Sequence, residues 1–149
     1  NRGGVRFHIV RVSPDRVGGH GLRPVWRESE RVSVSDSART LADAARSPDW
    51  AGGIRHLAAM LGNYASGGEQ DPARLASALS ENGKGAAFKR IGYLAERIWP
   101  DATSLVRACL ENRSAGAIKL DPAVRSRGRL NKRWGLWINA DIQRHEAAP

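Results

Sequence analysis

The chain has 149 residues and a mass of 16.2 kDa, enough for one domain with its own hydrophobic core. Hydrophobic residues make up 41% and charged residues 26%, which excludes a disordered chain, and no apolar run reaches the roughly 20 residues of a membrane-spanning helix. Lys and Arg number 24 against 15 Asp and Glu, so the net charge of +9 favours polyanionic partners. The single cysteine, Cys109, excludes an internal disulfide and is typical of a reducing cytoplasm.

Short strands are predicted near the N-terminus. Val5–Val12 (VRFHIVRV) is rich in alternating β-branched and aromatic residues, which is typical of a strand. Ser13–Gly21 contains Pro14 and three glycines, a composition that predicts a loop. Leu22–Trp26 and Arg31–Ser35 are predicted as two further strands.

Helical spacing of apolar residues predicts that the middle of the chain is α-helical. Asp36 is suited to cap a helix that Pro48 ends, because its carboxylate accepts from free backbone N–H groups. A second helix follows the break at Gly52–Gly53, Asp71–Pro72 opens a third, and Pro100–Asp101 opens the last. The clearest helix lies between these two proline starts, and its predicted inward face consists of Phe88, Ile91, Leu94, Ala95 and Ile98.

Strands return at the C-terminal end. Ala117–Leu120 and Trp134–Asn139 are predicted strands, and Asp121–Lys132 between them is predicted to be a long polar loop. Strands at both ends around a helical middle indicate an α+β domain. We expect this helical middle to pack on one mixed sheet that the N- and C-terminal strands share.

The sequence offers little for catalysis, and we expect no enzymatic activity, cofactor or metal. The four histidines are scattered without metal-ligand spacing, at positions His8, His20, His56 and His145. Cys109 lies on a predicted apolar helix face, as expected of an inert core thiol. The segment Glu81–Gly85 resembles a phosphate loop, but it lacks the first glycine and the hydroxyl residue after the lysine.

Basic residues are concentrated towards the C-terminus, and Arg125–Arg133 (RSRGRLNKR) is the densest run. Arginine presents a planar fork of donors to phosphate, so this segment and one helix are predicted to contact nucleic acid. The predicted contacts are Lys89, Arg90, Arg125, Arg127, Arg129, Lys132 and Arg133. The alternative is a solvated loop whose charge only aids solubility. Of the two tryptophans that follow, Trp134 is expected in the core, whereas Trp137 could stack on bases or pack inside.

Several segments, in order along the chain, resemble the AbiEi-type antitoxins of type IV (abortive infection) toxin–antitoxin systems. Val34–Asp43 (VSDSARTLAD) resembles the family's "VSD-x-x-RT-L-x-D" helix start, and Ser47–Gly53 (SPDWAGG) resembles the "P-x-x-x-GG" that follows. Phe88–Glu96 (FKRIGYLAE) is similar to the "KR-L-GYL-x-E" helix. Leu120–Pro122 with Gly128–Leu136 (GRLNKRWGL) resembles the "LDP…RWGL" ending, which Ile138 and Asn139 close.

The resemblance spans nearly the whole chain and corresponds to the family's C-terminal domain. It implies a single effector domain over residues 1–149 that counteracts a nucleotidyltransferase toxin, without a stable toxin complex, and takes part in repressing its own operon. Members usually carry an N-terminal winged helix-turn-helix that nothing in this sequence matches, and the chain begins at Asn1, so we expect a fragment that lacks this reader domain. The expected partner is operator DNA in the cytoplasm, with no membrane.

A rival hypothesis is a protein-interaction or oligomerisation module of a transcriptional regulator. In that case the positive charge only steers the domain towards DNA, and no side chain of this chain contacts nucleic acid directly.

Overall fold

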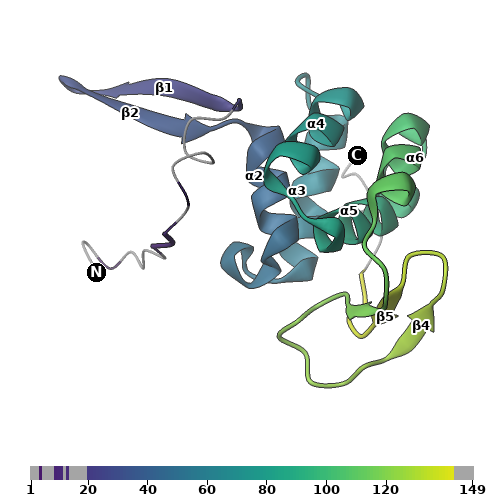
Figure 1. The fold of residues 1–149 in the computed structure, drawn as a ribbon. Coiled ribbons are helices and arrows are strands. Elements are labelled where there is room, and N and C mark those ends of the chain that lie inside the picture. Colours follow the sequence, from purple (N-terminus) through teal and green to yellow (C-terminus); the bar gives the residue numbers. More distant parts are fainter. Residues whose placement is uncertain (1–3, 5–8, 12, 14–19, 143–149) are drawn as a thin grey trace, which may run out of the picture.

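The structure is a computed structural model that describes residues 4, 9–11, 13 and 20–142 (Figure 1). The predicted strand Val5–Val12 lies for the most part outside the described residues. Among those residues, no helix is long and apolar enough to cross a membrane.

The first described elements form a β-hairpin, as the sequence predicts. Strand β1 (Leu22–Arg27) pairs antiparallel with β2 (Glu30–Ser35), so that Leu22 lies opposite Ser35. The turn between the strands places Glu28 at a φ of 55°, a conformation uncommon outside glycine. The hairpin projects from the helical part of the molecule (Figure 1).

The middle of the described chain is helical, as expected. Its helices are α2 (Ser37–Arg46), the short 3₁₀ helix η1 (Pro48–Ala51), α3 (Ile54–Ser66), α4 (Pro72–Asn82), α5 (Gly85–Ile98) and α6 (Thr103–Asn112). The predicted caps are confirmed: the Asp36 carboxylate accepts from the N–H of Arg39 at 2.8 Å, and that of Asp71 accepts from the N–H of Arg74 at 2.9 Å. Both caps satisfy a free backbone donor of the first turn.

Helix α5 lies in the centre of the core. Phe88, Ile91, Leu94 and Ala95 of its predicted inward face are buried, and Ile98 is half-buried. The core also includes residues of every other α-helix of the described chain and of the C-terminal segment that follows them: Leu41, Leu57, Leu61, Leu75, Leu79, Leu105, Cys109, Leu120, Trp134 and Leu136.

A small mixed sheet follows the helices. Strand β3 (Ile118–Lys119) pairs parallel with β5 (Leu136–Ile138), and β4 (Arg129–Asn131) pairs antiparallel with the other edge of β5. Strand β4 lies within the segment 121–132 that we predicted as loop. Its sequence, RLN, carries no strand pattern of its own, and its extended conformation comes from pairing with β5.

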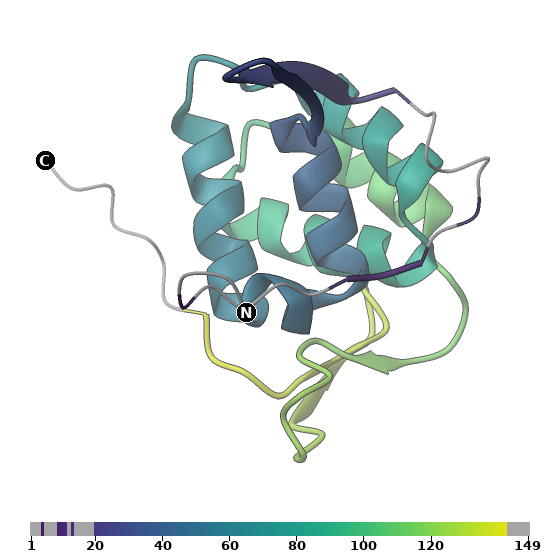
Figure 2. The same ribbon diagram turned by 90° about the vertical axis from the view of Figure 1, so that its left-hand side faces the viewer.

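The α+β class is confirmed, but the strands are arranged differently from the expectation. The described strands form two separate sheets, the β1–β2 hairpin and the β3–β5–β4 sheet, rather than one shared sheet. The two views place these sheets at opposite ends of the helical body (Figures 1 and 2). Each sheet is assembled from strands close in sequence, and the helices lie between the two sheets.

Candidate nucleic-acid interface

The residues predicted to contact phosphate divide into a buried pair and an exposed group. Lys89 and Arg90 on α5 are the buried pair, with 0% and 5% of their surface exposed. The prediction that these two residues contact a polyanion is therefore corrected. Both cations are engaged with backbone carbonyls inside the protein, and neither is presented to solvent.

Arg90 joins the end of α2 to the start of the C-terminal sheet. Its Nη1 donates to the carbonyls of Ala45 at 2.9 Å and Arg46 at 3.4 Å, its Nε to Leu120 at 3.0 Å, and its Nη2 to Lys119 at 3.2 Å. Burial lowers the pKa of Arg90, while nearby carboxylates act in the opposite direction. A guanidinium stays charged in proteins, so Arg90 is a buried structural cation.

Lys89 holds the segment that leads into β3. Its Nζ donates to the carbonyl of Gly116 at 2.5 Å and to that of Ala115 at 3.5 Å. Burial lowers the pKa of Lys89, and the positive charges of Arg113 and Arg90 lower it further. Lys89 and Arg90 therefore fix the backbone on both sides of β3 to helix α5 through hydrogen bonds to its carbonyl groups.

The exposed group lies on the C-terminal sheet and its loops. Arg125 and Arg127 belong to the loop before β4, Arg129 begins β4, and Lys132 follows β4; all four are exposed. Residues 122–133 contain five basic residues and no acidic one, so this surface carries concentrated positive charge. The structure thus gathers these four predicted contacts at one end of the molecule.

Arg133 and Trp134 share one carboxylate. The Nε of Arg133 lies 2.7 Å from Oε1 of Glu96 on α5, and the indole Nε1 of Trp134 donates to Oε2 at the same distance. Trp134 is fully buried, as predicted, whereas the Arg133 side chain is 56% exposed. Glu96 neutralises part of the charge of Arg133, which makes Arg133 a weaker phosphate contact than the other exposed cations.

The loop that carries Arg125 and Arg127 is fixed by residues that sequence reasoning did not single out for a site. The Asn139 amide donates to the carbonyls of Asp121 at 2.8 Å and Ser126 at 3.1 Å and accepts from the N–H of Asp121 at 2.9 Å. The ammonium of Lys119 donates to the carbonyls of Val124 and Arg125, both at 3.0 Å. These contacts hold the segment 121–126 at both of its ends. The only sequence signal for Asn139 and Lys119 is their place in or beside the segments that resemble the antitoxin family.

Two further features bear on how this surface could bind. The guanidinium of Arg127 lies 5.8 Å from the ring centroid of half-buried Trp137, a cation–π arrangement. A hollow of about 370 Å³ between α5 and α6 is lined by Arg107 and Arg133 together with Glu96, so cationic groups extend beside the sheet.

A second hollow, of about 410 Å³, lies away from this surface, at the base of the hairpin, and is lined by Arg23 and Glu69 among others.

Catalytic groups do not gather in the part of the chain that the structure describes. No set of three or more His, Cys, Asp or Glu side chains there is placed to hold a metal ion. Burial raises the pKa of the Cys109 thiol to about 12, so this cysteine is a core residue rather than a nucleophile.

Comparison of the chain with protein-family models, curated proteins and solved structures finds no match in any of the three.

Proposed function

We propose that this chain is the C-terminal domain of a type IV antitoxin, and that it contacts nucleic acid through the C-terminal cationic surface, defined as Arg125, Arg127, Arg129 and Lys132. One observation carries the proposal of contact: four exposed cations lie on a fixed loop and sheet whose segment 122–133 holds no acidic residue. A fixed array of guanidinium groups suits a phosphate backbone, because each contact then releases a counterion at little cost in loop ordering.

The antitoxin role rests on the resemblance of four ordered segments to the AbiEi-type family. Several residues of these four segments also stabilise the fold. Asp36 caps α2, Arg90 and Glu96 bond to the C-terminal segment, and Trp134 is buried in the core. A role against a nucleotidyltransferase toxin in the cytoplasm, without enzymatic activity, is part of the proposal.

The decisive test of contact is fluorescence-anisotropy titration of duplex DNA and of structured RNA over a series of salt concentrations. Neutralising Arg125, Arg127 and Arg129 together with alanine should flatten the log–log salt slope by about 2.7, at about 0.9 for each lost duplex phosphate contact. The matched control removes three exposed arginines elsewhere, Arg23, Arg27 and Arg55, and should leave the slope unchanged. If both triple variants flattened the salt slope equally, binding would depend on net charge alone, and the proposal of a defined contact surface would be refuted.

The antitoxin role has a separate test in cells that express the operon's nucleotidyltransferase toxin. Co-expression of the chain should restore growth, with folded protein verified in the lysate. Growth arrest in the presence of abundant folded chain would refute antitoxicity of this domain, whatever the binding experiment shows.

A protein-interaction module remains the second candidate, and one observation favours it. The hairpin exposes Trp26, Val32 and Val34, with 67%, 45% and 41% of their surface accessible. Loss of antitoxic function on substitution of these residues, with the C-terminal triple variant fully active, would support this candidate over nucleic-acid contact.

A further inference from the structure

The small C-terminal sheet has an inner and an outer face. Leu136 on β5 is buried in the core, and Ile118 and Ile138 pack against the core from the same face of the sheet. Because successive side chains of a strand point to opposite faces, Trp137, which lies between Leu136 and Ile138, belongs to the outer face. The sheet therefore directs a large aromatic ring away from the core.

Trp137 occupies the centre of this outer face. Strand β5 is the middle strand of the sheet, and the register places Trp137 opposite Lys119 of β3 on one side and opposite Leu130 of β4 on the other. All three residues are half-buried. The ammonium of Lys119 is held by the carbonyls of Val124 and Arg125, so the apolar part of this face consists of Trp137 and Leu130.

The C-terminal cationic surface lies around this apolar part. Arg129 and Lys132 lie next to Leu130 along the chain, on either side of it, and both are exposed. The guanidinium of Arg127 lies 5.8 Å from the ring centroid of Trp137. Groups that suit phosphate and an aromatic ring are therefore combined in one small surface.

The ring of Trp137 is only loosely covered by Arg127. On α5 the guanidinium of Arg97 lies 3.7 Å from the ring centroid of Tyr93, which is the separation of a close stack. The 5.8 Å between Arg127 and Trp137 is about 2 Å longer. A flat group can therefore reach the ring of Trp137 once the guanidinium of Arg127 turns towards a phosphate.

A duplex and a single strand would use such a surface differently. In a duplex the faces of the bases are stacked inside, so the phosphates could engage the cations but the aromatic ring would gain no partner. An unpaired base exposes its π-face and can stack on an aromatic side chain while the neighbouring phosphates bind cations. An aromatic ring within a cationic surface is therefore typical of proteins that bind single strands.

We propose that an unpaired base stacks on Trp137, and that the C-terminal cationic surface consequently binds single-stranded nucleic acid in preference to a duplex. This inference rests on the nucleic-acid contact proposed above and specifies the class of its ligand. Arg127 contacts the phosphate next to the stacked base, and Leu130 packs against the edge of that base.

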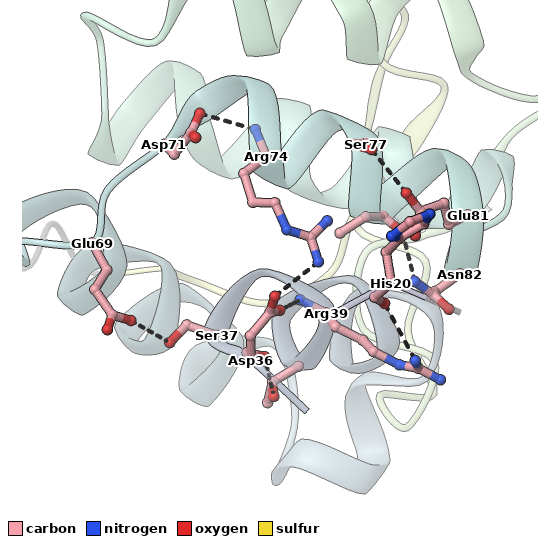
Figure 3. A network of polar contacts seen from close by, with 12 residues as sticks. His20, Asp36, Ser37, Arg39, Glu69, Asp71, Arg74, Ser77, Glu81 and Asn82 are labelled. Atoms are coloured by element: carbon pink, nitrogen blue, oxygen red, sulfur yellow. Dashed lines mark hydrogen bonds and ion pairs between the residues drawn. The ribbon is translucent and has the colours of Figure 1, made fainter. Parts of the chain in front are cut away.

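The opposite end of the molecule differs in charge and supplies a control. Its exposed tryptophan, Trp26, is 67% accessible and lies on a hairpin that carries three arginines and two glutamates. At the root of the hairpin Arg74 is already paired, because its Nη2 lies 2.8 Å from the carboxylate of Asp36 (Figure 3). Trp26 is therefore an exposed aromatic residue outside the proposed surface.

Titration with single strands tests the stacking directly. The probes are a fluorescent oligothymidylate of about 12 nucleotides, an abasic strand with the same number of phosphates, and a duplex of equal length. At about 0.15 M salt, which screens exposed charges, the native chain should bind the oligothymidylate about 5- to 150-fold more tightly than the abasic strand, and more tightly than the duplex. Equal affinity for the two strands, or tighter binding of the duplex, would overturn the proposal without any variant.

Substitution of Trp137 completes a thermodynamic cycle with the abasic strand. Trp137→Ala should lower the affinity for the oligothymidylate to that for the abasic strand and leave the abasic strand unaffected, because only stacking is lost. Trp137→Phe keeps an aromatic ring and should retain most of the discrimination, and Trp26→Ala should behave as the native chain. If Trp137→Ala weakened both strands by the same factor, Trp137 would only support the loop, and the stacking proposal would be wrong.

The salt dependence separates this proposal from the nucleic-acid contact itself. Trp137→Ala removes no phosphate contact and should keep the native log–log slope, whereas alanine at Arg125, Arg127 and Arg129 should flatten the slope on a single strand by about 2.1, at about 0.7 for each phosphate. A native chain that binds no nucleic acid refutes the proposed contact. Salt-dependent binding with equal affinity for both strands refutes the stacking alone. An oligouridylate in place of the oligothymidylate compares RNA with DNA as the source of the unpaired base.

Discussion

Replacement of Arg90 by methionine should destabilise the whole domain, since this buried guanidinium is a structural element. Methionine keeps an unbranched apolar stem but removes every donor. The two shortest bonds, to the carbonyls of Ala45 and Leu120, are 2.9 and 3.0 Å long. At about 1.5–3 kcal/mol for each bond from a charged donor, their loss should lower the free energy of unfolding by about 3–6 kcal/mol. That is a large part of the typical domain stability of about 5–15 kcal/mol.

The assay is urea unfolding followed by tryptophan fluorescence, with a thermal melt beside it. The midpoint temperature should fall by about 6 °C or more for a chain of this size. The matched control is Arg97→Met on the same helix, where the exposed side chain donates to the carbonyl of Tyr93 and stacks on its ring. Its expected loss is about 1 kcal/mol or less. If the two variants lost equal stability, the structural role assigned to Arg90 would be refuted.

Two further outcomes follow from contacts in the fold. Burial acts to raise the pKa of Asp36, but the N–H of Arg39 and the guanidinium of Arg74 lower it below its ordinary value of 3.8. The stabilisation by the ionised carboxylate is therefore complete above pH 3.8 and is lost as the pH falls through the lower pKa of the folded state. Asp36→Asn removes this titration, so the free energy of unfolding of the variant should fall less steeply with acidification than that of the native chain. Gly92→Ala would drive a methyl group into the buried ring of Trp134, and should cost about 1–3 kcal/mol in urea unfolding; an unchanged midpoint would contradict that tight packing.

The sequence by itself determined the local elements of this protein. Helix starts at Asp36 and Asp71 and the two hairpin strands depend on contacts within a few residues, so side-chain type and spacing were sufficient to predict them. The apolar residues of α5 were predicted to face inwards because their helical spacing can be recognised in the sequence. The class of fold followed from the order of those elements. The four exposed cations of the C-terminal surface were also predicted, because dense charge without apolar neighbours seldom becomes buried.

Only the tertiary structure decided which cationic side chains are buried and how the strands are divided between the two sheets. Lys89 and Arg90 are charged like Arg129, and no local pattern separates them. Their burial depends on carbonyls at Gly116, Leu120 and Ala45, which the fold brings to α5 from distant parts of the chain. In the same way β4 is a strand because β5 lies beside it, and the two sheets are separate because the helical core fills the space between them. These outcomes depend on contacts between residues far apart in sequence, which periodicity and propensity do not report.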